Sequence, residues 1–474
     1  MSDATFPDGL LSDPIFEQID YDLLTIGNHE LYLASVAQLT FAQFSKFYGE
    51  KYITSNVQIL NNATDQYEYI GKQYRYFTTQ HGLRIMAFGV LYDFRGNTNI
   101  TKVMKAATLV QQPWFQSAIS FSKPIDLFIV LGHNPARPGV SGSTFGTIFN
   151  AIRAKNPNTP IQLFGGHTHI RDFAVLDEGS TSLESGRYCE TLGWVSMSGI
   201  KSNTFTGNNK PRGVPNPSQK AVKVASATAT ASTVVPAPTH NPAFSNLLYS
   251  RRYIDWNRLS FAYHAIGSQS KTFDYHSGLR VTKNITETRK QLNLTALYGC
   301  VPQTYCESCQ PFLAPGNIFP VIQKALAATV INATRASTPR LIIINTGSIR
   351  FDLVQGPFTF DDSFIVSPFL DGFQYVPNVP FSQANQVLAA LNKADTRKRS
   401  LRPRDFSFTP LTGQDCIDDV YGELEGKPGL ARRSAPLTRG KHRRATTSLS
   451  PGYTTKGMCP CIFQSITLLQ LGLT

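Results

Sequence analysis

Three short segments of the sequence carry histidine or asparagine directly after an apolar run. They are GNHE at 27–30, GH at 132–133 and GGHTH at 165–169. Imidazole nitrogens and amide oxygens bind borderline divalent metals, and such metals polarise phosphoryl oxygens and acidify bound water. One such segment is usually a turn with a hydrogen-bonded histidine, but three in succession favour a metal centre.

Each segment ends a run of residues that predicts a β-strand. The runs cover residues 22–27, 126–132 and 161–166. Helix-like segments separate them, so the first 200 residues predict βαβ units and a largely parallel sheet. The carboxyl ends of parallel strands share one edge of a sheet, where ligands bind. We therefore expect the three segments to meet at one rim.

The local backbone of these segments also has a predicted form. Glycine before each histidine allows the chain to turn sharply towards a metal. If the segment after Gly166 is extended, His167 and His169 point the same way, because side chains alternate along a strand. Both would then reach one pair of metals.

In this order, the segments resemble the last three motifs of the calcineurin-like metallophosphoesterase superfamily, GNH[ED], GH and GHxH. The resemblance implies an α/β/β/α sandwich over residues 1–200 and two divalent ions of the zinc, manganese or iron class. It implies that Asn28, His133 and His167 bind one metal and that His169 binds the other. The same resemblance implies that the catalytic residue is His29, which would stabilise charge on the phosphoryl group and the leaving oxygen.

A smaller α/β domain is predicted over residues 246–392. Within it, residues 321–330 predict a helix, 341–344 a buried strand and 383–392 a further short helix. The strand runs directly into the sequence NTGSIR, so polar residues again follow a strand end.

This second region resembles the C-terminal domain of 5′-nucleotidases, through NTGSIR at 345–350 and DDSFIVSPF at 361–369. In that family an N-x-G-x-x-R loop and a later Pro-Phe contact the nucleotide. The substrate contacts that the resemblance implies are Asn345, Gly347, Arg350 and Phe369. Arg350 would offer donors to a phosphate or a base edge, and Phe369 a face for stacking. Taken alone, Phe369 also fits a buried core position, and both interpretations stay open.

The sequence departs from the superfamily in several places. The first two family motifs, D-x-H and G-D-x-x-D, supply the carboxylate that bridges the metals, and neither precedes Gly27. We therefore expect a chain truncated at its N-terminus, without its first strand, as a misstarted gene model would give. The alternative is a relative that has lost catalysis and only binds. Tyr32 stands where many relatives have an Asp that orients His29, and Arg289 is a loose match to a second substrate contact.

Together the resemblances imply a metal-dependent phosphoric monoester hydrolase of the 5′-nucleotidase type, acting in nucleotide catabolism. Its expected partner is a small phosphoester, most simply a nucleotide. The rival interpretation is a catalytically inactive protein that binds a nucleotide or phosphate. Which phosphoester is cleaved depends on the shape of the pocket, which the sequence does not define.

The net charge of +13 is concentrated in two segments. Residues 201–254 carry seven Lys or Arg and no acid, residues 393–474 carry fourteen against seven acids, and the rest sums to −1. Most of these basic residues belong to a Ser/Thr/Ala/Pro-rich linker predicted at 201–245 and to a tail predicted to be disordered from 393. The tail lacks interleaved aromatic residues, which disfavours a specific nucleic-acid binder.

Cysteines and sequons indicate the compartment. Cys300, Cys306 and Cys309 cluster without the second CxxC or His pair that a structural zinc site needs, so disulfides are the favoured use. Five N-x-[ST] sequons fit an extracellular or secretory parent protein, although the first residues do not form a signal peptide. No apolar run is long enough for a transmembrane helix. The apolar C-terminus reads as a free tail rather than as a lipid-anchor signal.

Overall fold

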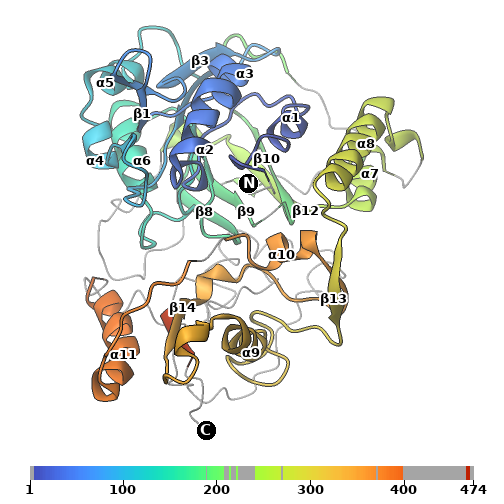
Figure 1. Ribbon diagram of the computed structural model, residues 1–474. Coiled ribbons are helices and arrows are strands. Elements are labelled where there is room, and N and C mark those ends of the chain that lie inside the picture. The colour runs from blue at the N-terminus through green and yellow to red at the C-terminus, as the bar shows by residue number, and fades with distance from the viewer. Residues whose placement is uncertain are drawn as a thin grey trace, which may run out of the picture.

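The computed structural model describes residues 5–187, 189–207, 213–214, 220–221, 241–267, 271–369, 372–398 and 466–469. Figure 1 shows an upper part built around β-sheets and a lower part formed by later residues of the chain. The lower part begins with β13 (Leu297–Val301). Within the described ranges, no helix is both long and apolar enough to cross a membrane.

A six-stranded sheet forms the centre of the upper part, in the order β3-β4-β6-β7-β9-β8. Its four inner strands are parallel, and the edge strands β3 and β8 run antiparallel to their neighbours. The strands are β3 (Tyr74–Thr78), β4 (Arg84–Gly89), β6 (Leu127–Leu131), β7 (Ile161–Gly165), β8 (Arg171–Asp177) and β9 (Ser180–Ser185). The predicted, largely parallel sheet is confirmed.

Three helices cover one face of this sheet: α4 (Ala106–Leu109), α5 (Pro113–Ile119) and α6 (Phe145–Lys155). The longest, α6, buries the side that runs from Phe145 to Ile152, with the spacing of a single helical face. These side chains pack with those of β4, β6 and β7 into one large apolar cluster. Strands covered in this way are largely apolar in β4, β6 and β7, as the sequence indicated.

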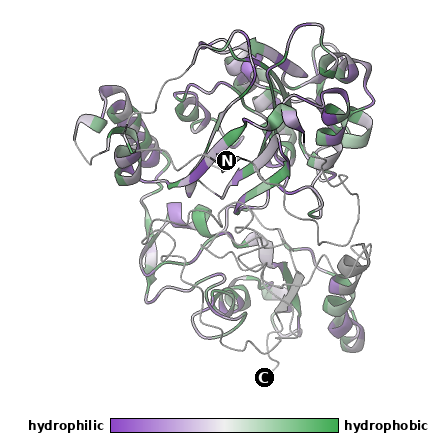
Figure 2. Cartoon of the chain, turned by 180° about the vertical axis from the view of Figure 1, so that it is seen from behind, coloured by the Kyte–Doolittle hydropathy of each residue, from purple (hydrophilic) through white to green (hydrophobic). Residues whose placement is uncertain are grey.

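A second sheet packs on the other face, in the order β10 (Thr191–Ser198), β12 (Leu248–Asp255) and β11 (Lys220–Ala221). Apolar side chains of β8, β9, β10 and β12 form the contact between the sheets. Seen from behind, Figure 2 shows hydrophobic residues on the strands of this region. The helix α7 (Arg258–Ile266) packs against β12. The layers helix, sheet, sheet and helix form the predicted α/β/β/α sandwich.

The remaining elements of the upper part lie around this sandwich. They are α1 (Asp13–Phe16), α2 (Ala34–Leu39), α3 (Ser45–Tyr48), α8 (His276–Gln291) and a small sheet of β2 (Gln66–Tyr69), β1 (Val57–Asn61) and β5 (Thr101–Val103). Aromatic and aliphatic side chains of α2, α3 and β1 form a second buried cluster. This cluster supports the segment that leads to Asn28.

The strand predicted over residues 22–27 is not formed, and this prediction was wrong. Leu24 makes one isolated parallel bridge, with Tyr52. The bridge does not extend into a ladder, because the N–H groups two and three residues beyond Tyr52 bind the carbonyls of Lys72 and Gly89. The segment is therefore extended chain rather than a strand.

Described residues of the linker predicted at 201–245 make hydrogen bonds to β12 and to the turn between β3 and β4. Thr204 Oγ1 donates to the Gly82 carbonyl at 2.8 Å, and β11 lies within the predicted linker. Because β10 and β12 pair over eight residues each, the second sheet crosses the boundary predicted at 245–246. Residues 222–240 lie outside the described part of the chain.

The described residues of the lower part form two small sheets and three α-helices. They are β13 with β15 (Gly356–Thr359), β14 (Ile342–Asn345) with β16 (Ile466–Leu469), α9 (Phe319–Thr329), α10 (Phe360–Val366) and α11 (Phe381–Lys398). Its core gathers Ile318, Phe319, Ile349 and Val366. The predicted helices and the predicted strand are confirmed by α9, α11 and β14.

The tail predicted from residue 393 differs from the structure in two places. The helix α11 continues to Lys398, and β16 pairs antiparallel with β14. The sequence of β16, ITLL, is rich in the β-branched and aliphatic residues that favour strands. The disorder predicted for residues 399–465 concerns residues outside the described ranges, as do Cys416, Cys459 and Cys461.

Two of the clustered cysteines form a bond. Cys306 and Cys309 are joined by a disulfide, which confirms the preference for disulfides over a zinc site. Cys300 and Cys189 are free and exposed. The disulfide closes a short loop that contains Glu307, which is buried.

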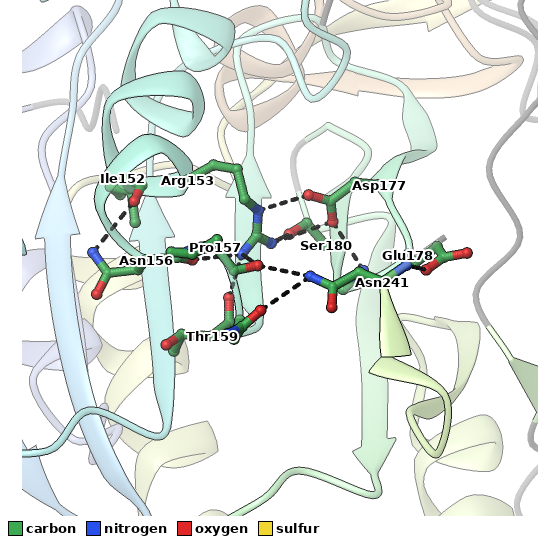
Figure 3. A network of polar contacts seen from close by, with 11 residues as sticks. Ile152, Arg153, Asn156, Pro157, Thr159, Asp177, Glu178, Ser180 and Asn241 are labelled. Atoms are coloured by element: carbon green, nitrogen blue, oxygen red, sulfur yellow. Dashed lines mark hydrogen bonds and ion pairs between the residues drawn. The ribbon is translucent and has the colours of Figure 1, made fainter. Parts of the chain in front are cut away.

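At the amino end of β7, Arg153 donates hydrogen bonds to five partners (Figure 3). Its guanidinium pairs with Asp177 at 2.7 Å and donates to Ser180 Oγ at 2.6 Å. It also donates to the carbonyls of Asn156, Pro157 and Thr159. Arg153 thus caps the end of α6 and joins it to the turn between β8 and β9.

Candidate active site

The histidine segments meet at the opposite, carboxyl end of the sheet. His133 follows β6, and His167 and His169 follow β7, the neighbouring parallel strand. Asn28 lies at the start of the short turn His29–Leu31, after the extended segment that contains Leu24. The rim predicted from the three segments is therefore present in the structure.

His133 and His167 approach each other directly. His133 Nε2 lies 3.2 Å from His167 Nδ1, and the ring centroids are 5.0 Å apart. Tyr92 covers the other side of His167, with ring centroids 4.3 Å apart in a stacked arrangement. Sequence reasoning missed Tyr92. The signal that could have found it is its position just after β4, which ends at the same edge of the sheet.

The GHTH segment is not extended, so the reason given for its two histidines pointing together was wrong. His167 and His169 have φ angles of 77° and 62°, in the left-handed region. Thr168, between them, donates its N–H and its hydroxyl to Glu184 Oε1. Glu184 is only 1% exposed, and burial raises its pKa well above its ordinary value. A buried carboxyl group thus shapes the turn that carries both histidines.

The glycines before the histidines also serve a purpose other than the one predicted. None of Gly27, Gly132 and Gly166 has a positive φ angle. A Cβ atom on Gly132 would lie 2.5 Å from the Phe145 ring, and one on Gly27 would lie 3.3 Å from His133 Nδ1. The first two glycines therefore permit close packing, not a sharp turn.

The side chain of Asn28 is buried, with 4% exposed. Its Nδ2 donates to the hydroxyl of Tyr32 at 2.7 Å. Its Oδ1 is buried and has no hydrogen-bond partner among the described residues. Tyr32, found where many relatives have an Asp, thus holds the amide of Asn28 and also packs edge-on against His29 at 5.3 Å.

His29 faces the lower part of the molecule. Its ring lies 6.0 Å from the ring of Phe369, and the guanidinium of Arg350 lies over Phe369 at 4.9 Å. Surrounding protein desolvates His29 and lowers its pKa, and Arg350 adds to this effect, although part of the ring is exposed. Phe369 is half-buried between the two parts, so it is not a core residue of the lower part.

The other predicted substrate residues lie in the loop after β14. Asn345 Oδ1 accepts the N–H of Gly347 at 2.9 Å, so this side chain caps its own turn. Arg350 lies at the end of the same loop. Arg289 is on α8 and pairs with Asp361 at 2.7 Å, which commits its guanidinium to an ion pair.

The imidazoles of the cluster are held in their neutral form. Burial is the main cause, and neighbouring histidines and Arg350 add to it. The pKa of His133 is lowered well below its ordinary value, that of His167 to about 4 and that of His169 to about 3. Neutral imidazole is the form that binds a metal.

The residues present fit part of a metal site. The unpartnered Asn28 Oδ1 and the facing nitrogens of His133 and His167 are suitable donors for a zinc- or manganese-class ion. Among the described residues, however, no group of three or more His, Cys, Asp or Glu side chains could hold a metal. The described chain therefore offers neutral donors, without the bridging carboxylate that two metals share.

Two family models match the chain, in the regions where the two resemblances lie. Residues 7–171 match the calcineurin-like phosphoesterase model, and residues 304–462 match the model of the NAD nucleotidase C-terminal domain. The first match contains the histidine segments, and the second contains Arg350 and Phe369.

Three similar proteins match most of this chain. A secreted protein of Arthroderma benhamiae is 52% identical over 96% of this chain and 67% of its own length. An uncharacterised protein of Schizosaccharomyces pombe is 37% identical over 92% of this chain and 72% of its own. The solved 5′-nucleotidase of Candida albicans SC5314 is 38% identical, with a TM-score of 0.66 over 83% of this chain and 64% of that one. The chain thus spans about two thirds of the length of these relatives. It belongs to the calcineurin-like metallophosphoesterase family and has a C-terminal domain of the NAD nucleotidase and 5′-nucleotidase type.

Proposed function

We propose that this chain is the histidine-bearing part of a metal-dependent 5′-nucleotidase that hydrolyses nucleotide monophosphates in nucleotide catabolism. The observation that carries the proposal is the contact of His29 with Phe369, beside Arg350. An aromatic face and a guanidinium suit a base and a phosphate, and they lie against the imidazole that would act on the phosphoester.

Each residue has a proposed task. Phe369 stacks on the base, and Arg350 donates to the phosphate or to a base edge. His29, with its lowered pKa, stabilises the charge that develops on the leaving oxygen. Asn28, His133 and His167 would hold one divalent ion and His169 a second. Bound ions would supply neutralisation of the phosphoryl charge and an acidified water.

A second function is a nucleotide-binding protein without turnover. The observation that favours it is that, among the described residues, no carboxylate joins the histidines in a group that could hold a metal, so the negative charge that would bridge two ions is not supplied there. In this case Arg350 and Phe369 still bind the nucleotide, and the histidine cluster does not hydrolyse it.

We also propose that the protein acts outside the cytosol. The Cys306–Cys309 disulfide supports this location, and the asparagines of all five sequons are exposed: Asn62, Asn99, Asn284, Asn293 and Asn332. The similar protein of Arthroderma benhamiae is named a secreted protein, which agrees with this location.

Phosphate release from AMP, measured with manganese or zinc supplied, tests the activity. We expect hydrolysis by the chain and a loss of about 100-fold in kcat for His29→Asn, since one acid–base or charge-stabilising group contributes this much. Equilibrium dialysis should show that the same variant still binds AMP. His276→Asn, on the exposed start of α8, is the matched control and should keep full activity.

The outcomes separate the two functions. AMP binding without hydrolysis, by a chain supplied with either metal, favours the binding protein. Neither binding nor hydrolysis contradicts both functions. The number of metal ions per chain, measured by elemental mass spectrometry, shows whether two ions bind or fewer.

A further inference from the structure

One largely buried arginine, Arg187, connects the upper part of the molecule to the loop that carries Arg350. Arg187 belongs to the upper part and lies two residues beyond β9. Its Nη1 pairs with Glu307 Oε2 at 3.2 Å and donates to the carbonyl of Arg350 at 2.7 Å. The same guanidinium lies over the ring of Phe351 at 4.6 Å.

This ion pair differs from other buried pairs in what it joins. The pairs Arg84–Asp126, Arg137–Asp172 and Arg153–Asp177 each link elements within the upper part. Arg187 and Glu307 come from the two parts, and their side chains are 11% and 5% exposed. A buried charge without its partner is costly, so the pair favours one arrangement of the two parts.

The lower part presents Glu307 in a fixed position. Glu307 lies inside the loop closed by the Cys306–Cys309 disulfide. Its N–H donates to Asp352 Oδ1 at 2.8 Å, and its carbonyl accepts from Asn317 Nδ2 at 3.1 Å. The backbone that carries this carboxylate is therefore held by the lower part through both its N–H and its carbonyl.

Arg350 is held through its backbone from two directions. Its N–H donates to the carbonyl of Val366, which ends α10, at 2.8 Å. Its carbonyl accepts from Arg187. The guanidinium of Arg350 lies over the ring of Phe369. Its Nε has no hydrogen-bond partner among the described residues. The backbone is thus fixed, while the side chain keeps a donor for a ligand.

We propose that Arg187 is a positioning residue that, with Glu307, fixes the Arg350 loop against the histidine cluster so that Arg350 and Phe369 can bind a nucleotide. The inference rests on the proposed function, because it concerns the same nucleotide site. Arg187 acts through Arg350 and does not itself touch the nucleotide.

The affinity for AMP, measured by equilibrium dialysis without metal, is the first test. Arg187→Gln should raise the Kd for AMP about tenfold, as expected for a lost hydrogen bond to a charged group. Glu307→Gln should act in the same direction with a smaller effect, because glutamine still accepts from Arg187. Arg84→Gln, which breaks an equally buried ion pair at the other end of the sheet, should leave the Kd unchanged.

A double-mutant cycle distinguishes positioning from a general loss of structure. If Arg187 acts through Arg350, Arg187→Gln in an Arg350→Ala background should weaken AMP binding no further, to within about twofold. Full additivity of the two effects would overturn the proposal, as would an unchanged Kd in folded Arg187→Gln.

Amide hydrogen exchange keeps the test independent of the proposed function. In Arg187→Gln, amides of residues 349–353 should exchange faster than in the wild type and in Arg84→Gln. If the wild type binds no AMP, the proposed function fails. The positioning of the loop is then decided by exchange alone, and equal exchange in all three proteins overturns it.

Discussion

The two ends of the central sheet use polar side chains in opposite ways. At the amino end, Arg153 donates to five partners on two segments of chain (Figure 3). At the carboxyl end, Asn28 Oδ1 and Arg350 Nε are buried and have no partner among the described residues, and two histidines have positive φ angles. Unpaired polar groups and unusual backbone cost stability, and they persist where a ligand later provides the partner. The comparison therefore separates the end that stabilises the fold from the end that is built to bind.

The largest expected effect concerns Arg153. Arg153→Ala removes a charged donor from Asp177 and a donor from each of three carbonyls, so the free energy of unfolding should fall by about 3–5 kcal/mol. Urea denaturation measures this loss, and the Kd for AMP should stay unchanged in the folded variant. Lys155→Ala, on the same turn of α6 and exposed, is the control. A loss below about 1 kcal/mol would contradict the role given to Arg153.

The histidine cluster should make the metal-free protein sensitive to acid. The unfolded chain has ordinary histidines with a pKa of about 6.5, whereas His167 and His169 have folded values of about 4 and about 3. The unfolded state therefore takes up protons first. The free energy of unfolding should fall by about 2 kcal/mol or more as the pH falls from 6.5 to 4.

Urea denaturation at several pH values checks this slope. The double variant His167→Asn and His169→Asn should lose much of it, whereas Arg153→Ala should keep it, because Arg153 does not titrate in this range. An unchanged slope in the histidine variant would place the acid sensitivity elsewhere in the chain.

A smaller loss is expected at the edge of the Arg153 network. Asn241 Nδ2 donates to the Pro157 carbonyl at 3.0 Å, and its Oδ1 accepts from Ala243 N at 2.9 Å. Asn241→Ala should lower the free energy of unfolding by about 1 kcal/mol, the usual cost of a lost cap. Thermal unfolding measures it, with the exposed Lys155→Ala again as the control.

The smallest expected change in stability is at the binding end. Asn28→Ala removes one hydrogen bond together with a buried oxygen that has no partner, so the two effects nearly cancel to within about 0.5 kcal/mol. Asn134, equally buried but paired with Thr144 through both amide atoms, is the matched control. Asn134→Ala should cost about 2 kcal/mol. Zinc affinity should fall only in Asn28→Ala; equal stability losses would contradict the comparison.

The sequence predicted the parts of the site that short motifs define. His133 and His167 were predicted to meet because β6 and β7 are apolar runs that end in histidine, and the parallel pairing brings those ends together. The prediction of a strand before Asn28 was wrong. An apolar run does not reveal whether the adjacent segment, here the residues after Tyr52, has N–H groups left to pair with it.

Other features depend on contacts between distant segments. Glu184 lies in the polar strand STSLES, and nothing local shows that both sides of this strand are buried. Arg187 and Glu307 are 120 residues apart, so their pairing has no local signal. Tyr92 lacks a motif, although the end of β4 beside it could have indicated the site. Contacts made across the chain, rather than along it, thus account for what was missed.

The ladder between β10 and β12 has a consequence for engineering. Eight paired residues on each strand hold the two ends of segment 199–247 at one place in the sheet, far along the chain from the histidine segments. Because the entropy of closing a loop grows slowly, doubling the length of this connection would cost only about 0.6 kcal/mol. An insertion in segment 199–247 would therefore begin and end where the paired strands already hold the chain, which makes this connection the natural place to attach a label.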